Sequence, residues 1–144
     1  MIVVKPLILR DLADGRDFAL QEDYTVLIDD HRLTAPEGSV TDGASIPRFL
    51  WRVVGSPFTG KYRGPAVLHD SAYRQTLIID GLPIVLNPIS RKDADTMFLR
   101  GMKGSGVGWL RRRVIYLAVR ACGHGSWQGP ARSTDSVPAL AIQG

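Results

Sequence analysis

Short apolar runs separated by turn-forming residues fill the first forty positions of the chain. Residues 2–9 are rich in valine, isoleucine and leucine, although Pro6 favours a bend or an edge strand there. Shorter runs follow at 17–20 and 24–28, and the chain returns through 33–35. Runs of this length with breakers between them predict strands joined by hairpins. We therefore expect a small N-terminal antiparallel β-meander.

Segments with helical spacing of apolar residues follow. The first begins near Pro65, which suits the first turn of a helix, and ends near Thr76. The second runs from 91 to 102 and follows Ser90, a favourable N-cap. In the third segment a packed apolar stripe is predicted at Leu110, Val114, Leu117, Ala118 and Ala121.

An apolar segment at 77–86 lies between the first two helices. Its Asp80-Gly81 pair is a favoured two-residue turn, so we expect an inserted β-hairpin there. The resulting fold class is α+β: a small N-terminal antiparallel β-meander followed by about three helices with an inserted β-hairpin. Residues 1–125 are expected to form a single domain. Residues 126–144, rich in proline, serine, alanine and glycine, are expected to form an extended or flexible tail.

Composition places the chain among ordinary globular proteins, with 44% apolar and 22% charged residues in 144. The single cysteine, Cys122, excludes an internal disulfide and a multi-cysteine zinc site. We find no signal-peptide pattern and no apolar run near the roughly 18 residues that a membrane span needs. The expectation is synthesis in a cytoplasm and no transmembrane segment.

The formal net charge is +4, and Arg111, Arg112 and Arg113 supply much of the excess. Such a balance permits contact with nucleic acid, anionic lipid or an acidic partner without selecting among them. Three arginines at the start of a helix are typical of a solvated face or a partner contact, so the sequence carries no strong nucleic-acid signal.

The densest chemistry lies at residues 67–74. His69 and Tyr73 are four positions apart and should share one face of the predicted helix, with Asp70 on the adjoining flank. On the second helix, Asp95 borders the apolar face and therefore needs a hydrogen-bond partner. The candidates are His69, Tyr73 and Arg74. Both an active site and a structural hydrogen-bond network fit this pattern.

The segment 36–47 should form a sharply turning loop, because glycines and prolines interrupt it. Thr41, Asp42 and Ser45 offer oxygen atoms that could bind a hard cation, and the loop amides could bind an anion. Alternatively, Asp42 or Ser45 is simply the N-cap of a short helix at 47–51. The two interpretations are compatible.

Three blocks of the chain, at 40–51, 66–73 and 90–98, together resemble the phage and prophage family catalogued as domain of unknown function 1353. The resemblance spans roughly residues 20–123. It implies a viral origin and a gene that lies among tail or lysis functions. The family brings no established activity, so the site must be argued from chemistry.

The central His-Asp-x-x-Tyr run also resembles the active-site helix of secreted phospholipases A2. That resemblance implies that His69 is a general base, that Asp70 and Asp42 are ligands of a divalent cation such as calcium, and that Tyr73 and Asp95 brace the histidine. The chain lacks the flanking cysteines and the glycine-rich calcium loop of those enzymes.

Two functions follow as expectations. The first is a virion-associated or tail-assembly component that contacts other phage structural proteins, made in the host cytoplasm and incorporated into the virion. The alternative is a small, cation-assisted hydrolase that contacts the host envelope and acts on its lipid or peptidoglycan.

Overall fold

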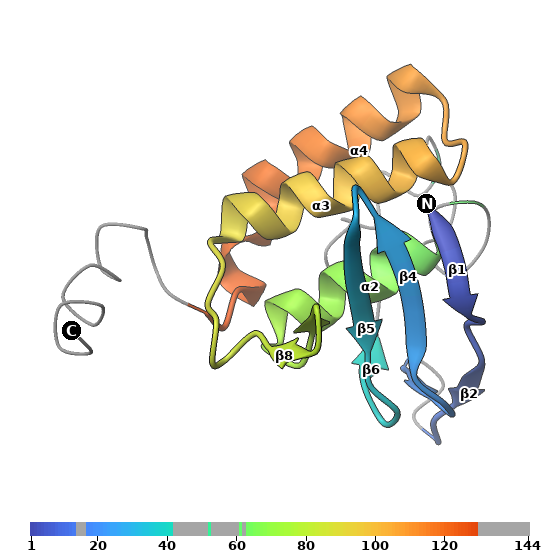
Figure 1. The fold of residues 1–144 in the computed structure, drawn as a ribbon. Coiled ribbons are helices and arrows are strands. Elements are labelled where there is room, and N and C mark those ends of the chain that lie inside the picture. The colour runs from blue at the N-terminus through green and yellow to red at the C-terminus, as the bar shows by residue number, and fades with distance from the viewer. Residues whose placement is uncertain (14–16, 42–51, 53–60, 62, 130–144) are drawn as a thin grey trace, which may run out of the picture.

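Most of the strands precede the helices in the computed structural model, which describes residues 1–13, 17–41, 52, 61 and 63–129 (Figure 1). The predicted α+β fold is confirmed, with an N-terminal antiparallel sheet followed by helices. The predicted loop residues Asp42 and Ser45 and the short helix at 47–51 lie outside the described residues.

The strands in the described part of the chain form two antiparallel sheets. They are β1 (Ile2–Lys5), β2 (Leu9–Asp11), β3 (Phe18–Leu20), β4 (Tyr24–Ile28), β5 (His31–Ala35), β6 (Val40–Thr41), β7 (Ile78–Ile79) and β8 (Leu82–Pro83). The larger sheet has the order β1-β4-β5-β7-β8, and the smaller has the order β2-β3-β6. The β4–β5 pair is in full register from Tyr24 opposite Ala35 to Ile28 opposite His31.

The Asp80-Gly81 turn between β7 and β8 is confirmed. Its φ angles of 51° and 84° are both positive, as a tight two-residue hairpin turn requires. The Asp80 carboxylate accepts hydrogen bonds from the Arg32 backbone N–H and from His31 Nδ1, each at 2.8 Å. Chiefly through the Arg32 bond, these contacts lower the pKa of Asp80. The hairpin is thereby tied to β5.

The helices are α2 (Arg63–Tyr73), α3 (Arg91–Gly104) and α4 (Trp109–Cys122), followed by a short 3₁₀ helix, η2 (Gly123–Ser126). Ser90 is the N-cap of α3, as predicted: its hydroxyl accepts from the Asp93 N–H, and the Asp93 carboxylate accepts from the Ser90 N–H. In Figure 1, α2 crosses behind β4 and β5, while α3 and α4 run side by side.

Helix α2 lies at the centre of the core. Every residue from Pro65 to Tyr73 is buried, because α2 contacts β5 and β6 as well as α3. An amphipathic surface helix would bury only one stripe. The polar side chains that α2 carries therefore have to find protein partners.

The prediction that α4 packs through the stripe containing Leu110 and Leu117 is wrong. Leu110 and Leu117 are 68% and 63% exposed, whereas Ile115 and Val119 are completely buried. The helix carries apolar residues at helical spacing on two opposite sides, and α3 packs against the side with Ile115 and Val119. Periodicity alone does not distinguish the two sides.

The first residues of the predicted tail at 126–144 are held against the core. Trp127 meets the Tyr73 ring edge-on at a centroid distance of 5.2 Å, and the Gln128 N–H donates to the Tyr73 carbonyl at 3.0 Å. The remaining residues of that segment, from 130 onward, lie outside the described part of the chain.

Replacing Gly64 with alanine is expected to destabilise the fold by about 1–3 kcal/mol. A Cβ atom at Gly64 would overlap the buried Tyr24 hydroxyl, so either β4 or α2 would have to shift. Urea unfolding of Gly64→Ala measures the effect. Gly125→Ala is the matched control, because a Cβ atom there meets nothing within 4 Å. Equal stability of the two variants would contradict the close approach of Tyr24.

Candidate functional site

Helices α2 and α3 bring three of the predicted site residues together. His69 and Tyr73 lie one turn apart on α2, and both reach Asp95 on α3. His69 Nε2 lies 2.7 Å from Asp95 Oδ1, and the Tyr73 hydroxyl donates to the same oxygen at 2.6 Å. The side chains of His69 and Asp95 are completely buried. Two of the three candidate partners of Asp95 therefore contact it.

Two arginines complete the site, and sequence reasoning missed both. Arg120 on α4 donates from Nη1 to Asp95 Oδ2 at 2.7 Å. Arg91 Nη1 lies 3.3 Å from the Tyr73 hydroxyl and 3.5 Å from Asp95 Oδ2. Arg91 also donates to the carbonyls of Val119 and Arg120 near the end of α4. Its spacing of four from Asp95 was a usable signal. Nothing in the sequence pointed to Arg120.

The hydrogen bonds keep Asp95 ionised despite its burial. Burial pushes the pKa of Asp95 upward, but the bonds from His69, Tyr73 and Arg120 outweigh it and lower the pKa below its usual value. Burial, followed by the bond to Asp95, holds the pKa of Tyr73 above its usual value, so Tyr73 stays protonated and donates. The bond to Asp95 likewise raises the pKa of Arg120.

These charges fix the orientation of His69. An ionised Asp95 only accepts hydrogen bonds, so Nε2 carries a proton and donates it to Oδ1. In the neutral imidazole the lone pair then belongs to Nδ1. Nδ1 is buried and has no hydrogen-bond partner among the described residues. The ring is held between Phe98, at a centroid distance of 4.7 Å, and Tyr73, at 4.2 Å.

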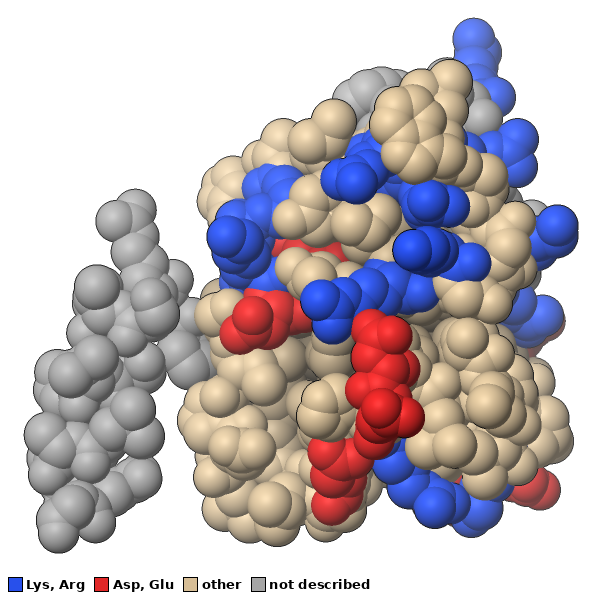
Figure 2. Space-filling model, turned by 45° about the horizontal axis from the view of Figure 1, so that its top comes forward, with Lys and Arg blue, Asp and Glu red and all other residues tan. Residues whose placement is uncertain are grey.

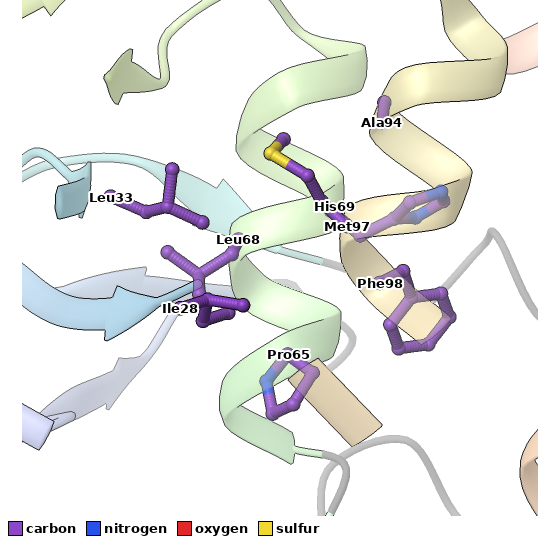
Figure 3. Close-up of a pocket in the computed structure, with 8 residues that line it drawn as sticks. All are labelled: Ile28, Leu33, Pro65, Leu68, His69, Ala94, Met97 and Phe98. Carbon is purple, nitrogen blue, oxygen red and sulfur yellow. The ribbon is translucent and has the colours of Figure 1, made fainter. Parts of the chain in front are cut away.

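A small cavity of about 10 Å³ adjoins His69, with room for about one water molecule (Figure 3). His69 reaches from α2 toward α3, and the other lining side chains are apolar. An imidazole whose Nε2 is held by a carboxylate and whose Nδ1 is unpaired can act as a general base. The lining residues are Ile28, Leu33, Pro65, Leu68, His69, Ala94, Met97 and Phe98.

Asp70 points to a different neighbour. Its carboxylate accepts a hydrogen bond from the Thr41 hydroxyl at the end of β6, and both residues are buried. Asp70 thus has a hydrogen-bond partner outside the His69–Asp95 pair. Among the residues that the structure describes, no group of three or more His, Cys, Asp or Glu side chains is arranged to hold a metal ion. Asp42, the second predicted ligand, lies outside them, so the metal site stays a prediction.

The lowered pKa of Asp95 predicts acid-sensitive stability. An unfolded aspartate titrates near 3.9, so ionised Asp95 stabilises the fold fully above that pH. The contribution is lost as the pH falls through the lower pKa of the folded state. We expect Asp95→Asn, whose amide does not titrate, to lose less stability than the wild type as the pH falls from about 5 to about 2. Urea unfolding across this range measures it. Parallel losses would contradict the lowered pKa.

Comparison with known proteins places the chain in a family. The family model described as "Protein of unknown function (DUF1353)" matches residues 18–119. The uncharacterized protein y4jT of Sinorhizobium fredii is 33% identical over 90 residues, which cover 61% of this chain and 23% of that protein. The chain therefore spans less than a quarter of that curated relative. No solved structure matches the chain. The match over most of its length shows that the chain belongs to the DUF1353 family.

Proposed function

We propose that the protein is a small hydrolase in which His69 is the general base. The observation that carries the proposal is the contrast between the two ring nitrogens: Nε2 is held by Asp95, and Nδ1 is buried without a partner among the described residues. A structural histidine would gain by pairing both nitrogens. Here Nδ1 is left to take a proton from an attacking water, while Asp95 stabilises the imidazolium that forms.

The surroundings of His69 favour an apolar substrate. The cavity beside the ring is lined otherwise by apolar side chains. Since the His69 side chain is completely buried, substrate and water reach it only when neighbouring side chains move apart. When these side chains move apart they lose apolar contacts with one another. An acyl chain can replace those contacts, whereas a glycan or a peptide is less apolar and replaces them less well. Of the two envelope materials, lipid is the better candidate and peptidoglycan the second.

Asp70 is the proposed ligand of a divalent cation such as calcium. Asp70 follows His69 directly on α2, and its hydrogen bond with Thr41 brings the end of β6 against that helix. A bound cation would polarise the carbonyl of the substrate. Calcium needs six or more oxygen ligands. Thr41 and Asp70 supply too few, so Asp42 is proposed as a further ligand.

The test is hydrolysis of defined envelope material. Wild-type protein and His69→Gln are incubated with phospholipid vesicles and, separately, with peptidoglycan sacculi, with calcium or with a chelator. Release of fatty acid or of soluble fragments by the wild type alone supports the proposal. Equal release by both proteins would refute the role of His69. Release that is insensitive to the chelator would refute the role of the cation but not that of the base.

A non-catalytic phage component is the second candidate, and the closed network supports it. Asp95 is completely buried and joins three helices through His69 and Tyr73 of α2, Arg91 of α3 and Arg120 of α4. Such a network can lock the helices in place without having any catalytic role. The proposed setting is a virion or tail-assembly complex with other phage proteins, formed after synthesis in the host cytoplasm.

This second candidate makes a distinct prediction for His69→Gln. A glutamine amide can still donate to Asp95, so the network and the assembly function should be retained. Infectivity of the encoding phage, and mass spectrometry of its purified particles, provide the measurement. Normal particles that contain the variant protein would support assembly, whereas absence of the wild-type protein from particles would exclude a virion role.

A further inference from the structure

The outward face of α4 is apolar at its centre. Leu110 and Leu117 are seven residues apart and therefore project from the same side of the helix. They lie roughly opposite Ile115 and Val119, which are completely buried. Trp109, at the start of the helix, is 63% exposed. Three large apolar side chains are thus exposed to solvent on one helix.

Basic side chains flank this apolar face. Arg113 lies on the same side of α4 between the two leucines, and Arg111 precedes it by one half-turn. Both are exposed, and neither side chain makes a hydrogen bond or ion pair with any residue in the described part of the chain. Figure 2 shows Lys and Arg side chains spread over the α3 and α4 side of the molecule, with uncharged residues between them and acidic side chains beside some of them.

The charge is concentrated in this part of the sequence. Residues 96–129 contain six Lys or Arg residues and no Asp or Glu. The remainder of the chain has twelve basic and fourteen acidic residues, so it is slightly acidic. The net charge of +4 therefore comes entirely from the segment that contains α4 and the second half of α3.

We propose that the outward face of α4 binds the surface of an anionic phospholipid membrane. Leucine and tryptophan side chains would enter the boundary between headgroups and acyl chains, and Arg111 and Arg113 would pair with lipid phosphates. No helix in the described part of the chain is long and apolar enough to span a membrane. The helix would therefore lie along the surface, with the core of the protein above it.

The apolar centre is what favours a membrane over nucleic acid. A phosphodiester backbone would satisfy the arginines but would offer no apolar surface for Leu110 and Leu117. A lipid surface offers phosphates to the arginines and acyl chains to the leucines. The proposal does not depend on the hydrolytic one, because it uses neither His69 nor Asp95.

Vesicle sedimentation of the full chain tests the proposal. Binding of the wild type to phosphatidylcholine vesicles with phosphatidylglycerol should exceed binding to phosphatidylcholine alone. Arg111→Gln with Arg113→Gln should weaken the binding by roughly 30-fold, at about 1 kcal/mol for each basic residue near the surface. Leu110→Gln with Leu117→Gln should weaken it by roughly tenfold or more.

The matched controls change exposed residues away from α4. Leu82→Gln with Leu86→Gln and Lys5→Gln with Arg10→Gln should leave vesicle binding unchanged. His69→Gln should also bind normally, which separates this proposal from the hydrolytic one. Equal binding to both vesicle types would overturn the proposal, and so would equal losses in the controls. It would also be overturned if the protein bound duplex DNA but not vesicles, and if the leucine substitutions left the DNA binding unchanged.

Discussion

Replacing Asp95 with alanine is expected to lower the free energy of unfolding by about 3–5 kcal/mol, as when one partner of a buried ion pair is removed. The carboxylate is completely buried and accepts from His69, Tyr73 and Arg120. Without it, two buried donors on α2 lose their acceptor, and Arg120 loses its counter-charge. Urea unfolding monitored by circular dichroism provides the measurement.

Two further variants separate charge from shape. Asp95→Asn keeps an acceptor and nearly the same volume, so it should cost less, about 1–3 kcal/mol. Asp93→Ala is the control on the same helix: it removes an exposed carboxylate that only completes the capping box, at a cost of about 1 kcal/mol or less. If Asp95→Ala were no more destabilising than Asp93→Ala, the central place of Asp95 in the network would be untenable.

Local sequence signals predicted the elements of the fold because short-range chemistry fixes them. The Asp80-Gly81 turn and the Ser90 cap act within a few residues, and both occur where predicted. The strand at 24–28 matches its apolar run. The buried side of α4 was predicted wrongly, because two apolar stripes compete there and only the position of α3 selects between them.

The candidate site was predictable only where spacing determines proximity. His69 and Tyr73 share a helix face by periodicity, and the need of Asp95 for a partner linked the two helices. Arg120 was not predictable, since its contact with Asp95 depends on how α4 crosses α3. For the same reason the sequence did not reveal that Asp70 faces Thr41 and not the His69–Asp95 pair.

Replacing His69 with glutamine is expected to lower the proposed hydrolysis by 10²–10⁴-fold, the usual contribution of a general base, while the free energy of unfolding changes by less than about 1 kcal/mol. The glutamine amide can donate to Asp95 Oδ1 in place of Nε2, but it cannot take a proton from water. Replacing His69 with alanine instead removes the donor and leaves a cavity beside Phe98. That variant should therefore lose about 1–3 kcal/mol of stability as well as activity.

The pair of variants distinguishes a base from a structural histidine. Initial rates of fatty-acid release and urea midpoints are measured on the same protein preparations. If His69 is the base, His69→Gln is stable and inactive, and its defect cannot be attributed to unfolding. If His69 only holds α2 against α3, His69→Gln retains function, and His69→Ala loses function in proportion to its stability. A stable His69→Gln protein with wild-type rates would exclude His69 as the base, because the substitution removes the basic Nδ1 and keeps a donor to Asp95 Oδ1.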